Sequence, residues 1–278
     1  MAIKLDGKLV SSIIREEIKQ EVLEILNDQE DRAPHCAVVL VGDDPASSTY
    51  VKNKEKAFKD VFMMSSTYRL DNSTTQKELL DIIHLLNNDD DIDGILVQLP
   101  LPKHIDSKVI IEAIDPNKDV DGLTMVNQGK LYSGIGLEPC TPAGVIELLK
   151  RYEIDLAGKH CVVVGRSDLV GRPLSVLLLK ENGTVTICHS KTSDLKAITQ
   201  QADVLLVAIG QKQFITPEYL KEGVVLVDVG IHRHLGKIVG DCDPSCYDKT
   251  SYYTPVPGSV GPMTITMLLK NTLKAFNL

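Results

Sequence analysis

The segment STYVKNKEKAF, residues 48–58, holds three lysines in five positions, and a helix would separate them into two groups. At about 100° per residue, Lys54 falls within the apolar stripe of such a helix. The other members of this stripe are Tyr50, Val51, Ala57, Phe58 and Val61. The neighbouring lysines fall on the opposite side, which is typical of a face in contact with solvent: Lys52, Lys56 and Lys59.

A lysine inside an apolar stripe must reach out to solvent, pair with an acid or face a cavity. If it faces a cavity, partial desolvation would let the Lys54 amine exchange protons near neutral pH, as a general base does. Tyr50 precedes it by four residues and therefore lies one turn away on the same face. The segment predicts a site that joins a phenol and an amine, with a solvent-extended Lys54 as the plain alternative.

Two further segments offer partners for Lys54. In VQLPLP, Gln98 follows a buried apolar run at the carboxyl end of a predicted strand, where open α/β sheets bind ligands. In NKDVDGLT, Asp119 and Asp121 lie in a turn before Gly122. A simple Asp-Gly turn explains this second segment equally well.

Gly165 opens a turn, GRSDLVGRP, which is a degenerate form of a dinucleotide-binding turn. Ser167 takes the place of a second glycine, and Gly171 begins the following helix. Glycines at a strand-to-helix turn let the backbone approach a pyrophosphate next to free N–H groups. An ordinary tight turn is the alternative, but the position between a buried strand and a helix favours nucleotide binding.

The end of the next strand indicates which nucleotide binds. NAD-specific sites usually place an acid there for the ribose hydroxyl, whereas this strand ends in CHSKT, residues 188–192. His189 and Ser190 occupy the strand end, and Arg166 lies in the preceding turn. A planar guanidinium and a hydroxyl suit a 2′-phosphate. We therefore expect NADP rather than NAD, unless these are ordinary polar residues at a strand end.

Around these segments, buried apolar runs alternate with segments of helical periodicity. The first half contains an amphipathic helix at 10–26 and buried strands at 36–42 and 94–100. After a section rich in Pro and Gly, further apolar runs follow at 160–165, 184–189, 204–210 and 224–230. This alternation predicts an α/β protein with two α/β domains, the second built on a parallel sheet.

Composition excludes several classes of function. With 278 residues, of which 43% are hydrophobic, the chain can bury a sizeable core, and a net charge of −8 argues against nucleic-acid binding. We expect a cytoplasmic protein without membrane association, because the sequence shows no signal peptide or bilayer span. The six cysteines lack paired metal-ligand spacing, which predicts reduced structural thiols and no metal site.

Taken together, seven segments resemble one enzyme family. They are GDDPASSTYVKNKEKA, ILVQLPLP, NKDVDGLT, PCTPAG, VVVGRSDLVGRP, TICHSKT and YTPVPGSVGPMT. Their order and content are similar to those of the bifunctional methylenetetrahydrofolate dehydrogenase/methenyltetrahydrofolate cyclohydrolase family of the bacterial FolD type, across residues 42–264. The resemblance implies a substrate domain at 1–140 completed by the helix at 260–278, and a Rossmann-type NADP domain at 141–259. It also implies a folate cleft between the domains and a homodimer.

This family oxidises 5,10-methylenetetrahydrofolate with NADP⁺ to the 5,10-methenyl cation, which water then opens to 10-formyltetrahydrofolate. The resemblance implies four catalytic residues: Lys54, its partner Gln98, Tyr50 at the folate ring and Asp121 at the pterin. The implied folate contacts are Ser47, Tyr50, Val51, Gln98, Leu99, Pro100, Asp121, Gly258, Val260, Gly261 and Pro262. The implied NADP contacts are Gly165, Arg166, Ser167, Gly171, His189, Ser190 and Ile231.

Two positions depart from the family pattern. Ser259 stands in the implied folate loop where a glycine is usual, and VFMMSSTYRL, after the lysine helix, lacks an expected glycine. Two alternative functions remain. A shikimate-type NADP dehydrogenase also uses a Lys/Asp pair, but it does not explain Tyr50 or TPVPGSVGP. A non-catalytic NADP-binding sensor would have no reason to keep Lys54, Gln98 and Asp121 together.

Overall fold

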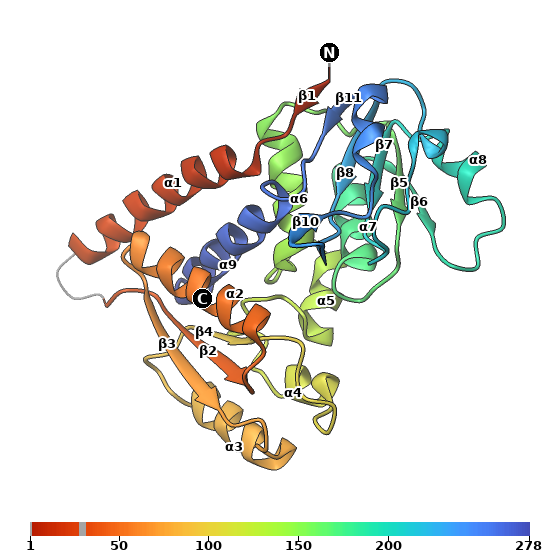
Figure 1. Ribbon diagram of the computed structural model, residues 1–278. Helices are drawn as coiled ribbons and strands as arrows, with labels where there is room; N and C mark the ends of the chain where they lie inside the picture. Colours follow the sequence, from red (N-terminus) through yellow and green to blue (C-terminus); the bar gives the residue numbers. More distant parts are fainter. Residues whose placement is uncertain (1, 28–31) are drawn as a thin grey trace. The chain divides into compact units, whose positions relative to one another are not determined.

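The computed structural model describes residues 2–27 and 32–278 (Figure 1). Its chain divides into two compact units. The three-stranded unit comprises residues 13–140 and 265–278, and the six-stranded unit comprises residues 1–12 and 141–264. These ranges differ from the expected boundaries at residues 1–12 and 260–264, which group with the second half of the chain. Among the described helices, none is both long and apolar enough to cross a membrane.

A parallel sheet in the order β3-β2-β4 forms the centre of the three-stranded unit. The strands are β2 (His35–Val41), β3 (Met64–Leu70) and β4 (Gly94–Val97). The helices are α2 (Pro45–Asp60), α3 (Gln76–Asn87), α4 (Ser107–Glu112) and α5 (Met125–Tyr132), together with most of α1 (Gly7–Asn27) and α9 (Val260–Phe276).

Both faces of β2 are covered, which explains its unbroken apolar sequence. Ala37, Val39 and Val41 pack in one cluster with residues of α3 and α4. Because successive side chains point to opposite faces of a strand, the residues between them face the other side. These residues are buried as well: Cys36, Val38 and Leu40.

The six-stranded unit is built on a parallel sheet in the order β1-β11-β8-β7-β5-β6. Its strands are β1 (Ile3–Lys4), β5 (His160–Val164), β6 (Thr184–Cys188), β7 (Val204–Val207), β8 (Val224–Asp228) and β11 (Thr250–Tyr253). The helices are α6 (Cys140–Arg151), α7 (Gly171–Lys180), α8 (Leu195–Thr199), η1 (Pro217–Tyr219) and η2 (Pro244–Lys249). A separate antiparallel hairpin consists of β9 (His232–His234) and β10 (Lys237–Val239).

The order of the strands locates a switch point in this sheet. From β5 the chain continues to β6 on one side, and β7 then pairs with β5 on the other side. Open α/β sheets bind ligands outside the carboxyl ends of the strands at such a point. The pairing of β1 with β11 explains why the first residues of the chain belong to this unit.

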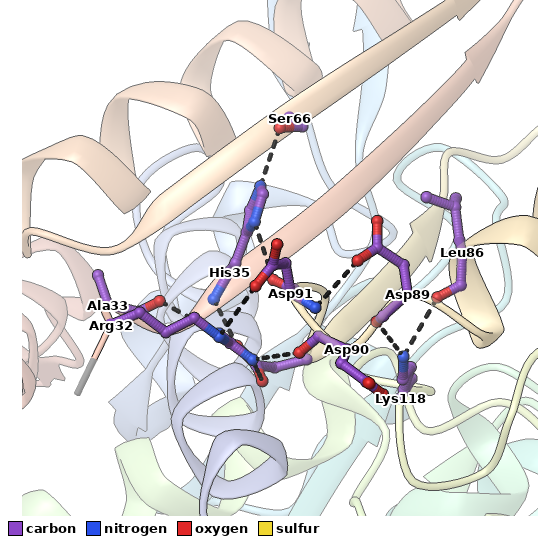
Figure 2. A network of polar contacts seen from close by, with 10 residues as sticks. Arg32, Ala33, His35, Ser66, Leu86, Asp89, Asp90, Asp91 and Lys118 are labelled. Carbon is purple, nitrogen blue, oxygen red and sulfur yellow. Dashed lines mark hydrogen bonds and ion pairs between the residues drawn. The ribbon is translucent and has the colours of Figure 1, made fainter. Parts of the chain in front are cut away.

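A polar network holds the amino end of β2 (Figure 2). The His35 backbone N–H donates to Asp93 Oδ2 at 2.8 Å, and the same carboxylate receives two N–H groups of Arg32 at 2.7 and 2.8 Å. The His35 ring contacts Asp91 O through Nδ1 at 3.0 Å and Ser66 Oγ through Nε2 at 2.8 Å. The network therefore ties β2 to both neighbouring strands, at the end opposite to the carboxyl ends.

Candidate active site

Lys54 and Gln98 form the central contact of the candidate site. Lys54 Nζ donates to Gln98 Oε1 at 2.9 Å, which joins α2 to the residue that follows β4. The other end of the amide is held as well, because Gln98 Nε2 donates to Leu99 O at 2.7 Å. If this amide were rotated by half a turn, Gln98 Nε2 would face the N–H groups of Lys54 and Gln98 Oε1 would face Leu99 O. The two contacts therefore fix Oε1 toward the amine.

Helix α2 presents Lys54 as the apolar stripe predicts. The helix begins at Pro45, after Asp44 accepts the N–H of Ser47 at 2.7 Å. Lys54 is half-buried, and its lysine neighbours are exposed: Lys52, Lys56 and Lys59. The predicted separation of Lys54 from these lysines is confirmed.

The other α2 residues of the implied site differ in exposure. The Tyr50 side chain is 42% exposed, one turn before Lys54, and is open to a ligand. Ser47 and Val51 are buried, so their side chains support the helix from within. After β4, Leu99 is half-buried and Pro100 is exposed.

Two buried thiols share the surroundings of Lys54 and Asp121. Burial raises the pKa of Cys36 to about 12, against the opposing positive charge of Lys54. Burial, followed by the negative charge of Asp121, raises the pKa of Cys140 well above its usual range, and Lys54 again opposes this shift. Because amine and carboxylate act on the same two thiols, Lys54 and Asp121 lie in one neighbourhood. Both thiols stay protonated at neutral pH and serve as small apolar neighbours.

Asp119 builds the turn that carries Asp121. Its buried carboxylate accepts the N–H of Leu123 at 3.1 Å and the N–H and hydroxyl of Thr124, both at 2.8 Å. A fourth donor is Asn127 Nδ2 at 2.9 Å. Burial raises the pKa of Asp119, and these hydrogen bonds oppose the shift. The two aspartates thus differ: Asp119 is a buried organiser of the turn, and Asp121 is half-buried two residues later.

Asn271 of α9 holds the same turn from another side, and sequence reasoning missed it. Its Nδ2 donates to Val120 O at 2.9 Å and to Glu138 O at 2.8 Å, and it lies 3.6 Å from Cys140 Sγ. The sequence did contain a sign of this residue: Asn271 is a polar residue one turn after Met267 on an apolar helix face. The same kind of pattern singled out Lys54.

In the six-stranded unit, the turn after β5 leaves no room for side chains at its glycines. Gly165 has φ +131°, and a Cβ there would lie 2.2 Å from Ala208 O, after β7. A Cβ on Gly171 would lie 2.3 Å from Gly165 O. The Ser167 Oγ accepts the N–H groups of Val170 and Gly171 at 3.2 and 3.3 Å, so it caps the start of α7.

Basic and hydroxyl groups surround this turn. Arg166 and Ser190 are exposed, and within the described part of the chain no carboxylate pairs with the Arg166 guanidinium. After β6, the His189 N–H donates to Thr192 Oγ1 at 2.9 Å, and His189 Nδ1 accepts the Lys191 N–H at 3.1 Å. These contacts fold the strand end into a turn that leaves the hydroxyl of Ser190 in solvent.

The remaining candidates lie after β8 and before α9. Ile231 is 48% exposed, and a Cβ on Gly261 would come 4.0 Å from its Cδ1, so the structure brings these two residues together. Gly258 takes φ +112°, whereas Ser259 has no positive φ. The buried Ser259 Oγ donates to Leu5 O at 2.8 Å. Serine is therefore compatible with this loop, which it ties to the segment after β1.

Within the described residues, no group of three or more His, Cys, Asp and Glu side chains could hold a metal ion. All six cysteines are buried and free.

Comparisons with known proteins cover the whole of this site. Residues 5–121 match the model of the tetrahydrofolate dehydrogenase/cyclohydrolase catalytic domain, and residues 139–278 match that of its NAD(P)-binding domain. The chain is 54% identical to the bifunctional protein FolD of Halothermothrix orenii over 98% of this chain and 96% of the relative.

Solved structures agree with this match. The bifunctional FolD methylenetetrahydrofolate dehydrogenase/cyclohydrolase of Campylobacter jejuni is 49% identical with a TM-score of 0.97, over 100% of this chain and 99% of that one. The Trypanosoma brucei enzyme, complexed with NADP cofactor and inhibitor, is 36% identical with a TM-score of 0.94, over 99% and 97% of the chains. A shikimate dehydrogenase from Thermus thermophilus, at 15% identity and a TM-score of 0.54, shares the fold alone.

Proposed function

The chain belongs to the tetrahydrofolate dehydrogenase/cyclohydrolase family, and we propose that its two reactions depend on the Lys54–Gln98 pair and on the turn that begins at Gly165. The protein oxidises 5,10-methylenetetrahydrofolate with NADP⁺ to 5,10-methenyltetrahydrofolate and hydrolyses this product to 10-formyltetrahydrofolate. The single observation that carries the proposed site is the 2.9 Å contact between Lys54 Nζ and Gln98 Oε1.

The donor set after β5 and β6 fits NADP⁺. Gly165 and Gly171 let this turn pack closely against its own and neighbouring backbone, and the pyrophosphate would bind at the turn. The exposed Arg166, Ser167 and Ser190 would hold the 2′-phosphate and its ribose. His189 would shape the adenosine side, and Ile231 would contact the nicotinamide side. When bound, NADP⁺ supplies the oxidising equivalent for the first reaction.

The oxidation mainly requires alignment of the one-carbon unit. We assign the orientation of the folate ring to the exposed Tyr50 and the binding of the pterin to Asp121. Asp119 and Asn271 act indirectly, because they fix the turn that carries Asp121. The other proposed folate contacts are Ser47, Val51, Gln98, Leu99, Pro100, Gly258, Val260, Gly261 and Pro262. Of these, Ser47 and Val51 are buried and act by supporting α2.

The hydrolysis requires water to attack a cationic carbon and a proton to leave the tetrahedral intermediate. We assign this proton transfer to Lys54, whose amine contacts Gln98 Oε1 at 2.9 Å. Gln98 orients the amine, because its Nε2 is committed to Leu99 O and its Oε1 must accept from Lys54. The ring then opens to leave the formyl group on N10, and one proton is released.

An absorbance assay tests the two reactions together. NADPH should form only when both NADP⁺ and 5,10-methylenetetrahydrofolate are present, and NAD⁺ should support a much lower rate. Chemically prepared 5,10-methenyltetrahydrofolate should then disappear faster with enzyme than in buffer. Shikimate with NADP⁺ should give no NADPH. Formation of NADPH from this mixture would favour the alternative dehydrogenase.

We further propose that the protein is a cytoplasmic homodimer. Support for a reducing compartment comes from its six free, buried cysteines. Light scattering after size-exclusion chromatography should give twice the mass of one chain, and a mass of one chain would reject the dimer.

A further inference from the structure

Two buried carboxylates organise the carboxyl ends of β7 and β8. The Asp241 side chain is fully buried, and its Oδ2 accepts the N–H groups of Ile209 at 2.8 Å and Gly210 at 3.0 Å. The Asp228 carboxylate, also buried, accepts the N–H groups of Gly230 and Asp241 at 2.9 and 3.0 Å. Each carboxylate thus holds backbone amides of a loop that follows a strand.

The two aspartates lie in direct contact through the backbone, and glycines make this approach feasible. A Cβ on Gly240 would lie 1.9 Å from Asp228 Oδ2, and a Cβ on Gly230 would lie 2.4 Å from Asp241 Cγ. The Asp228 Oδ2 additionally accepts the N–H of Cys242 at 2.8 Å. Any side chain at either glycine would push the two loops apart.

His232 completes the contacts of Asp241. Its Nε2 lies 2.7 Å from Asp241 Oδ1, and since a carboxylate oxygen can only accept, this nitrogen carries the proton. His232 directly follows Ile231, whose side chain is half exposed beside Gly261. The carboxylate of Asp241 therefore fixes the residue after Ile231 through one oxygen and the loop after β7 through the other.

The position of this cluster points to the cofactor rather than to stability alone. Ala208, the residue before the fixed amides of Ile209 and Gly210, crowds Gly165 at the switch point between β5 and β7. Ligands of open α/β sheets bind at this place. The loops held by Asp241 thus flank the turn proposed for the pyrophosphate and the residue proposed for the nicotinamide.

We propose that Asp241 is a positioning residue for the dehydrogenase reaction, which through Ile209, Gly210 and His232 fixes the backbone that borders the nicotinamide half of NADP⁺. The proposal rests on the proposed function. The proposal predicts different effects on the two activities, because the hydrolysis assigned to Lys54 needs no contact with the loops after β7 and β8.

Asp241→Asn provides the test. The amide of asparagine has one oxygen where the carboxylate has two, so its NH₂ group would face either the N–H groups of Ile209 and Gly210 or the Nε2–H of His232. We expect the dehydrogenase kcat/KM for NADP⁺ to fall by about 10-fold or more, mainly through KM, as for the loss of a buried charge-assisted hydrogen bond. The cyclohydrolase kcat/KM of the same preparation should stay within about twofold of wild type, which a general loss of folding would not produce.

Asp203→Asn is the matched control. Asp203 accepts the His160 N–H at 3.0 Å and Lys221 Nζ at 2.6 Å, but it precedes β7, at the amino edge of the same sheet. This control should lower the melting temperature and leave both activities unchanged. If Asp241→Asn yields no folded protein, His232→Gln tests the same contact and should reduce the dehydrogenase alone.

Unchanged dehydrogenase kinetics in Asp241→Asn, or in His232→Gln where the first variant does not fold, would overturn the proposal. A parallel fall of both activities would also overturn it. Failure of the proposed function would look different, because wild-type protein would then form no NADPH from 5,10-methylenetetrahydrofolate.

Discussion

His35 and His160 occupy the same place in two different sheets. Each begins a strand that is paired on both sides, β2 or β5. Each donates its backbone N–H to an aspartate that directly precedes a neighbouring strand, Asp93 at 2.8 Å and Asp203 at 3.0 Å. Each ring also contacts a hydroxyl of the other neighbouring strand through Nε2, at 2.8 and 2.9 Å. The Nδ1 atoms lie 3.0 and 3.2 Å from the carbonyl oxygens two residues before these aspartates. Because a carbonyl only accepts, Nδ1 carries the proton in both rings.

This equivalence predicts similar costs for the two histidines. His35→Ala and His160→Ala should each lower the free energy of unfolding by about 1–3 kcal/mol, because each removes two ring hydrogen bonds, one to a neighbouring strand and one to the loop before another. Calorimetric or urea unfolding of the two variants measures the loss. Activities at low temperature should persist, since both rings lie at the amino ends of their strands. A decrease of the free energy of unfolding by less than about 0.5 kcal/mol in both variants would show that these contacts do not stabilise the fold.

The role proposed for Lys54 predicts a selective loss of hydrolysis. Lys54→Met should reduce cyclohydrolase turnover by about 10²-fold or more, the usual contribution of a general base, while NADP⁺ binding survives. Lys56→Met is the matched control, because Lys56 lies two residues later on the exposed face of the same helix. Cyclohydrolase turnover at the wild-type rate in Lys54→Met would refute the assignment.

Cofactor preference should depend on Arg166. Arg166→Gln removes an exposed guanidinium and should raise KM for NADP⁺ by about 10-fold or more, with little change for NAD⁺ and none in hydrolysis. Arg172→Gln is the control, since this arginine pairs with Asp168 on the protein itself. Equal increases of KM for NADP⁺ and NAD⁺ in Arg166→Gln would speak against a contact with the 2′-phosphate.

Asp228 should make stability depend on pH. Burial, followed by the negative charge of Asp241, raises the pKa of Asp228 to about 6, against partial opposition from its N–H donors. As pH falls from 7 to 5, the folded protein therefore takes up a proton that an ordinary unfolded aspartate does not bind, and this contribution to stability grows by up to about 1.4 kcal/mol per pH unit. It is fully present below the ordinary aspartate range and is lost as pH rises through 6.

Comparison of wild type with Asp228→Asn isolates this contribution, because all other groups titrate in both proteins. The stability of wild type relative to the variant should rise between pH 7 and 5. A constant difference over this range would show that Asp228 does not titrate there.

Phe62 lies in the segment between α2 and β3, where the family pattern led us to expect a glycine. It takes φ +61° and is 50% exposed, with Lys19 Nζ 5.5 Å from its ring centre. Phe62→Gly should raise the free energy of unfolding by about 0.5–1 kcal/mol, because the left-handed conformation costs glycine least. Phe62→Ala keeps the strain and loses the ring contact, so it should be the less stable of the two variants. The reverse order in thermal unfolding would contradict this explanation.

The parts of the fold visible in the sequence are those with local signals. Buried strands such as β2 and β5 have continuous apolar runs, and α2 has an apolar stripe that isolates Lys54. β1 is different, because it is two residues long and exposed, and only its pairing with β11 defines it. No local pattern marks a partner about 250 residues away. The grouping of residues 1–12 therefore differed from the expectation.

The same limit applies to the site. Lys54 and Gln98 could be predicted because each stands at a position, an apolar stripe and a strand end, where a polar side chain is conspicuous. Asp241 lies in GDCDPS, which reads as an ordinary turn. The role proposed for Asp241 rests on its burial and on its partners at 209, 210 and 232, which only the folded chain brings together.

Each of the two units is built from two separate segments of the chain, and this affects the order in which they can fold during synthesis. The six-stranded sheet cannot accept β1 until β11 has left the ribosome, and the three-stranded unit lacks Asn271 and its clamp on Val120 until the segment after residue 264 emerges. Neither unit can therefore complete its fold until the residues after β8 have been synthesised. Until then a nascent chain exposes an unpaired sheet edge and an incomplete core, and both features favour aggregation of incomplete chains.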